Sequence, residues 1–88
     1  STNSYLEAKL LLEKTVLLEP RNILAWHLKG IAHSKLKEVN LANLSAAEEY
    51  LIRNDFKRSK YFAKKVLEKS ISGSPQSIRA SDILNIVN

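Results

Sequence analysis

The chain has 88 residues, of which 44% are apolar and 26% are charged, and it carries a net charge of +5. This length allows one small domain, and the apolar content is too high for an intrinsically disordered chain. The absence of cysteine excludes disulfide bonds and thiolate metal sites, and it favours the cytoplasm or another reducing intracellular compartment. No apolar run approaches the roughly 18 residues that a membrane-spanning helix needs.

Periodic apolar residues, interrupted by turn and capping residues, predict five helices and no strand. Pro20 ends the first helix because proline disfavours helical backbone at the residue before it, and Asn22 is a suitable N-cap for the second. Asp55 marks the turn into the fourth helix, and Ser74 followed by Pro75 opens the fifth. The expected helices cover residues 4–19, 23–37, 41–53, 56–70 and 76–87. We therefore expect one all-α domain over residues 1–88 in which neighbouring helices run antiparallel.

The fourth expected helix has the clearest division between a buried and an exposed face. At about 100° per residue, its apolar and small residues form one stripe that is expected to face the core. The stripe consists of Phe56, Ser59, Phe62, Ala63, Val66 and Leu67. The opposite face is a basic patch made of Lys57, Arg58, Lys60, Tyr61, Lys64 and Lys65.

The first two expected helices are less clearly divided. The first has a helically spaced set of apolar and small residues, namely Tyr5, Ala8, Leu11, Leu12, Thr15 and Leu18. The second has two apolar faces, one with Leu24, Leu28, Ile31 and Ala32, the other with Trp26, Gly30 and His33. A helix with two packing faces is expected to lie between two neighbours, as in a stacked array.

The spacing around Pro20 resembles that of the tetratricopeptide (TPR) repeat family. Ala8, Leu12, Thr15 and Pro20 are similar to the second half of such a repeat, and Trp26, Gly30 and His33 to the opening of the next. A second match runs through Ala47, Tyr50, Asn54, Asp55, Phe56, Ser59, Ala63 and Val66. The two matches are separated by one helix more than a regular array would have. The resemblance implies a short, irregular α-solenoid, or a piece of a longer array, in which Gly30 lets a neighbouring helix approach closely. An unrelated small helical bundle is the alternative fold.

The resemblance also implies a function in protein–protein recognition. A concave face lined by the second, third and fifth helices would bind a peptide or helix of a partner protein through Trp26, Lys29, His33 and Tyr50. A second hypothesis is a structural segment of a larger assembly, or a homo-oligomer formed through unfinished repeat ends. A third is nucleic-acid or anionic-surface binding by the basic patch.

Catalytic and metal chemistry is not predicted. His27 and His33 point about 120° apart on one helix, so they cannot share a metal ion without help from other elements. The adjacent Glu48 and Glu49 also point apart, and we expect them to be solvated or to cap a helix. No glycine-rich phosphate-binding loop is present. The sequence thus predicts no enzyme activity, no cofactor and no metal.

Overall fold

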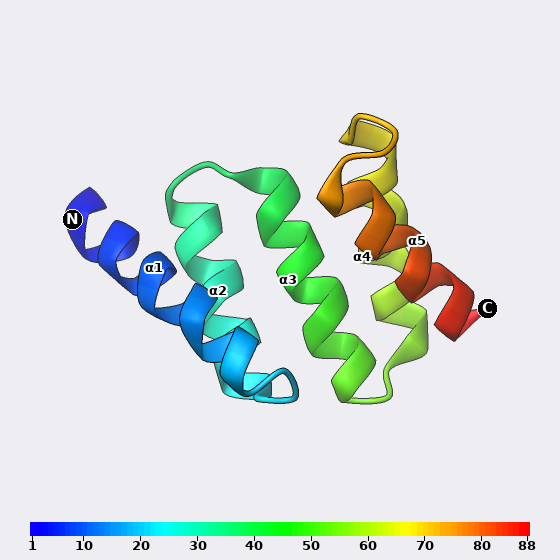
Figure 1. The fold of residues 1–88 in the computed structure, drawn as a ribbon, viewed down its shortest axis with the longest axis horizontal. Helices are drawn as coiled ribbons and strands as arrows, with labels where there is room; N and C mark the ends of the chain where they lie inside the picture. Colours follow the sequence, from blue (N-terminus) through cyan, green and yellow to red (C-terminus); the bar gives the residue numbers. More distant parts are fainter.

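The computed structural model describes all 88 residues, which form five α-helices and no strand (Figure 1). The helices are α1 (Thr2–Leu18), α2 (Ile23–Lys35), α3 (Val39–Ile52), α4 (Phe56–Lys69) and α5 (Pro75–Val87). This confirms the all-α prediction. Each helix matches one expected helix, and no boundary differs from its expected position by more than two residues.

Local chemistry explains where the helices begin. The side chains of Asn22, Asp55 and Ser74 accept hydrogen bonds from the backbone N–H three residues later, as N-caps do. Pro75 occupies the first turn of α5, where its missing N–H costs no hydrogen bond. These caps confirm three of the predicted boundaries.

The helices α2 and α3 end in left-handed turns at Lys37 and Asn54, whose φ angles are 63° and 61°. The N–H of Glu38 donates to the carbonyl of His33 at 2.8 Å, and the N–H of Asp55 donates to the carbonyl of Tyr50 at 2.9 Å. Both turns are Schellman motifs, which reverse the chain tightly and satisfy carbonyls at the helix end. Successive helices are therefore antiparallel neighbours.

The helices pack mainly in chain order and not around a common axis. α1 contacts α2 only, α2 contacts α1 and α3, and α4 contacts α3 and α5. One contact skips a helix, because α3 also packs against α5, which lies in front of α4 in Figure 1. The result is an open array with overall dimensions of 37 × 25 × 19 Å and with α1 at one end.

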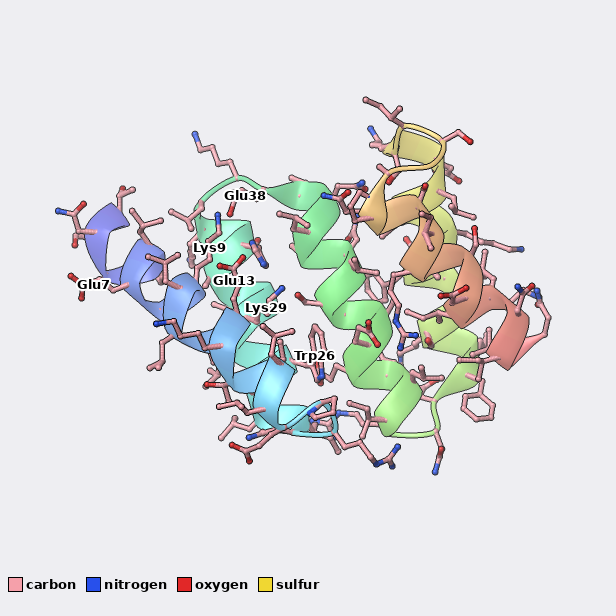
Figure 2. The ribbon with its side chains drawn as sticks, in the orientation of Figure 1. Glu7, Lys9, Glu13, Trp26, Lys29 and Glu38 are labelled. Atoms are coloured by element: carbon pink, nitrogen blue, oxygen red, sulfur yellow. The ribbon has the colours of Figure 1, made fainter.

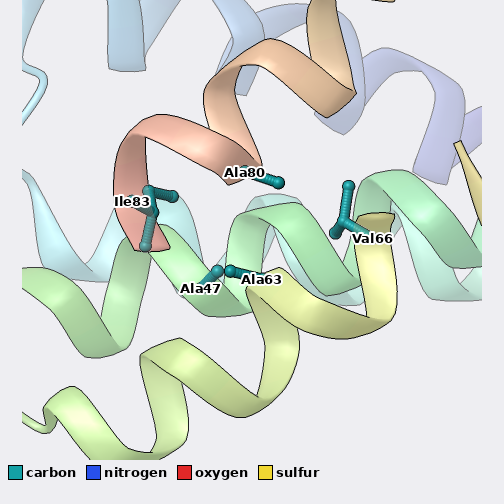
Figure 3. Close-up of a cluster of buried hydrophobic side chains, with 5 residues drawn as sticks. All are labelled: Ala47, Ala63, Val66, Ala80 and Ile83. Carbon is teal, nitrogen blue, oxygen red and sulfur yellow. The ribbon is translucent and has the colours of Figure 1, made fainter. Parts of the chain in front are cut away.

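The main core lies among α3, α4 and α5. It is a cluster of Ala47, Ala63, Val66, Ala80 and Ile83, all fully buried (Figure 3). Three of these side chains are alanine, so the three helices approach closely. The α1–α2 end of the array buries only Val16, Ala25 and Ala32 among its apolar residues. The α3–α4–α5 end of the array therefore buries more apolar side chains than the α1–α2 end.

The observed burial confirms the predicted stripe of α4, but in α1 and α2 the buried residues differ from those predicted. Ser59, Ala63 and Val66 of α4 are fully buried, although Phe56 at the start of the stripe is exposed. In α1 four of the six predicted residues are half-buried, namely Tyr5, Ala8, Leu12 and Thr15. Leu11 and Leu18 are exposed and Val16 is buried, because the side that α2 covers is rotated from the expected one toward Val16.

On α2 the predicted face with Trp26, Gly30 and His33 is covered, whereas the other predicted face is covered only at Ala32. Leu24, Leu28 and Ile31 are exposed, with 64% of Leu24 accessible to solvent. Gly30 lies against α3, but a Cβ added there would be 3.5 Å from the Cβ of Ser45, an ordinary contact distance. The close approach expected at Gly30 is present, but it leaves room for a methyl group.

Candidate functional site

One side of the α1–α2–α3 end carries a chain of polar contacts centred on His33 (Figure 2). The Nδ1 atom of His33 is 3.0 Å from Oε1 of Glu38, and its Nε2 atom is 3.0 Å from Nζ of Lys29. Lys9 of α1 donates to the other oxygen of Glu38 at 2.9 Å. Because Lys29 can only donate, these contacts require a neutral imidazole with its proton on Nδ1.

The electrostatics of this group follow from burial and from the hydrogen bonds. Burial lowers the pKa of His33 and also the pKa of Lys29, since both lose hydration of their charged forms. The hydrogen bond from Lys9, and after it the one from His33, lowers the pKa of Glu38. The bond between Lys9 and Glu38 is the one side-chain hydrogen bond that joins α1 to the rest of the fold. We interpret the group as a structural connection.

Two further residues predicted to bind a partner belong to the same side. Trp26 is half-buried, and its indole N–H donates to the carbonyl of Pro20 at 2.9 Å. The ammonium of Lys29 lies 5.4 Å from the centre of the Trp26 ring (Figure 2). The prediction for His33 is wrong as a direct contact, because its side chain is completely buried and cannot reach a partner. It lies on the face of α2, with Trp26 and Gly30, that the sequence predicted to pack against a neighbour.

The acidic pair of α3 also differs from the expectation. Glu48 and Glu49 are both buried, so neither is a solvated surface residue. Glu48 accepts two hydrogen bonds at 2.7 Å from the guanidinium of Arg79 on α5. Glu49 accepts from Arg53 at 2.9 Å and contacts Nδ1 of His27 at 3.0 Å. These pairs connect α3 to α5 and to α2, which nothing in the local sequence could indicate.

On the side of α3 that faces away from Glu48, helices α2, α3 and α4 form an open groove with a volume of about 260 Å³. Small residues of α2 and α3, including Gly30, Ala42 and Ala46, lie along its base, and Ile31 lines it from α2. Tyr50 and Phe62 line its α4 side and stack with their ring centres 5.7 Å apart and their planes 5° apart. Of the four predicted partner-binding residues, only Tyr50 lies here.

The groove continues onto exposed apolar surface of α2. Leu28 and Leu24 precede Ile31 by three and seven residues, so they lie on the same side of the helix. All three are exposed. The sequence pattern predicts instead that this stripe packs against a neighbouring helix. The signal that could have located the groove is the pair of small residues Ala42 and Ala46, one turn apart on α3, beside such a stripe.

The basic patch lies on the surface of α4 and accounts for the charge of the whole molecule. The helix has six basic residues and one acidic residue, so its net charge equals the +5 of the chain. Four members of the predicted patch are exposed, and Lys60 and Lys65 are half-buried. Arg58 pairs with Asp55 at 2.7 Å and lies 5.7 Å from the ring centre of Tyr50, at the edge of the groove. Lys65 lies 5.0 Å from the ring centre of Tyr61.

The largest hollow, about 420 Å³, lies beside the α4–α5 loop and is lined mostly by serines and by Asp82. Its lining contains no histidine, lysine or arginine. Nowhere do three or more His, Asp or Glu side chains gather in a way that could hold a metal ion. None of the five helices is both long and apolar enough to cross a membrane.

Comparison with known proteins identifies no relative. No protein-family model, no curated protein and no solved structure matches the chain. The likeness to TPR repeats therefore rests on the residues and spacings given above.

Proposed function

We propose that this chain is a TPR-like protein-interaction module that binds a helical segment of a partner protein in the groove formed by α2, α3 and α4. The observation that supports this most is the composition of the groove. Gly30, Ala42 and Ala46 give it small residues, and Ile31, Tyr50 and Phe62 give it large apolar ones. Its polar lining residues are His27, Ser34, Asn43 and Glu49, and it adjoins the exposed Leu24 and Leu28. The lack of cysteine suits a reducing intracellular compartment.

A helix suits this surface better than a small molecule does. The groove is smaller than the roughly 300–1,000 Å³ of typical small-molecule cavities, and it is open along one side. A partner helix would place apolar side chains at i, i+3, i+4 and i+7 into such a surface, and Ala42 and Ala46 would let its backbone approach closely.

The proposal can be tested by selecting amphipathic 20-residue helices from a display library against the whole chain. Chemical-shift changes on adding a selected peptide are expected at Ile31, Ala46 and Tyr50. Ala46→Arg fills the groove and should weaken binding about tenfold or more, whereas Asn85→Arg, at an exposed position of α5, should not. Shift changes confined to the Trp26 side, or an unchanged Kd for Ala46→Arg, would exclude the groove.

A second candidate function is binding of a nucleic-acid backbone or another anionic surface by α4. It is supported by the concentration of the entire net charge on this one helix, with Tyr61 exposed among its lysines. Retention on single-stranded DNA should then fall steeply with salt, and the double substitution of Lys57→Glu with Lys64→Glu should abolish it. No retention at low salt would remove this candidate.

A further inference from the structure

The outer side of α1 is an uncovered apolar surface at the end of the array. Five leucines of this helix are exposed, and Leu17 and Leu18 are 82% and 84% accessible. The other three are Leu6, Leu10 and Leu11. α1 contacts no helix but α2, so nothing in the molecule covers this side (Figure 1). Several large apolar side chains exposed together on one helix mark an interaction site more often than a free surface.

The five leucines form two rows along the helix, one on each side of a line of polar residues. At about 100° per residue, Leu6, Leu10 and Leu17 fall within about 40° of one another, and Leu11 and Leu18 within about 20°. Two exposed charged residues, Glu7 and Lys14, lie between these two groups. Neither has an ion-pair partner within the molecule, and Figure 2 shows Glu7 pointing away from the other helices.

The positions of these two charges are self-complementary. Glu7 and Lys14 are seven residues apart, so they occupy nearly the same angular position one above the other. Their midpoint falls between residues 10 and 11, and the midpoint of α1 (Thr2–Leu18) is residue 10. If a second α1 runs antiparallel across this point, Glu7 of each copy lies opposite Lys14 of the other. A parallel pair would instead place Glu7 opposite Glu7 and Lys14 opposite Lys14.

We propose that α1 is a self-association surface through which two copies of the chain pair antiparallel about a two-fold axis. The two groups of leucines are buried in this pairing, and the two Glu7–Lys14 contacts between them set its direction. A helix of 17 residues is about 26 Å long, so the interface lies at the small end of specific interfaces and the dimer is reversible. The proposal does not depend on the proposed function, because α1 does not line the groove.

The test uses the whole chain in sedimentation equilibrium from about 10 µM to about 1 mM. The wild type is expected to shift from the mass of a monomer to that of a dimer over this range. Glu7→Lys alone, or Lys14→Glu alone, replaces both attractive contacts by repulsive ones and should raise Kd about tenfold or more. A one-to-one mixture of the two variants should form a heterodimer of near wild-type affinity, and the double variant should regain self-association.

The matched control is Ile71→Glu, in the α4–α5 loop, where an apolar side chain is as exposed as Leu17. It should leave the dimer unchanged, whereas Leu10→Glu should abolish it. Far-UV circular dichroism checks that each variant keeps its helices, which substitution of exposed residues should not disturb. A monomer at every concentration, no heterodimer in the mixture, or equal disruption by Ile71→Glu would each overturn the proposal.

Discussion

His33 makes the stability of this fold sensitive to mild acid. Its buried imidazole must stay neutral to donate from Nδ1 to Glu38 and to accept at Nε2 from Lys29. The charged groups that face it are Lys29 on its own helix, Glu38 after the helix and, through Glu38, Lys9 of α1. Protonation in the folded state would place a positive imidazolium against the ammonium of Lys29 and break that hydrogen bond.

The sign and size of the effect follow from linkage. Burial sets the folded pKa of His33 below its unfolded value of about 6.5. The unfolded chain therefore binds the additional proton first, and stability falls as the pH falls between the unfolded and the folded pKa. If His33 stays neutral down to pH 5.5, the free energy of unfolding drops by about 1.4 kcal/mol between pH 7.5 and pH 5.5. Glu38 does not contribute in this window, because its pKa is lowered from 4.5.

Urea unfolding at pH 7.5 and pH 5.5 measures this change. The wild type should lose up to about 1.4 kcal/mol, His33→Gln should lose much less, and His27→Gln should lose as much as the wild type because it keeps His33. Should His33→Gln fail to fold, an NMR titration of the His33 ring in the wild type reports its protonation directly. An equal loss in all three proteins, or a ring that titrates near pH 6.5, would refute the reasoning.

Three further predictions concern stability in urea at pH 7.5. Ile83→Ala should lower the free energy of unfolding by about 2–5 kcal/mol because it opens a cavity in the core. Ile86→Ala, at an exposed position one turn away, should change this free energy by less than about 1 kcal/mol. Similar losses in the two variants would contradict the assignment of Ile83 to the core. Lys37→Gly should raise it by about 1 kcal/mol, since glycine adopts the left-handed turn without strain, and a loss would mean that this turn is not left-handed. Ser45→Ala should raise it by up to about 1 kcal/mol, because the buried Oγ of Ser45 has no hydrogen-bond partner; a loss above about 1 kcal/mol would indicate that it has one in solution.

The helices and their ends could be predicted because they depend on residues close together in the chain. Asn22, Asp55 and Ser74 each cap a backbone N–H only three residues away. The buried stripe of α4 was also predictable, since its opposite face carries almost nothing but charge and only one side can be buried. Membership of the TPR family remains a prediction from spacing alone.

The candidate site depended on the tertiary structure. Glu48 is buried because Arg79, 31 residues later, lies beside it on α5, and Ile31 lines a groove because α4 brings Phe62 alongside. In α1 and α2 the apolar residues surround much of the helix, so periodicity shows which sides can be buried but not which side a neighbour covers. Sequence alone therefore determined the five helices and their boundaries to within two residues. Packing between distant segments decided that His33 lies inside, that the groove forms on the far side of α3, and that the leucines of α1 stay uncovered.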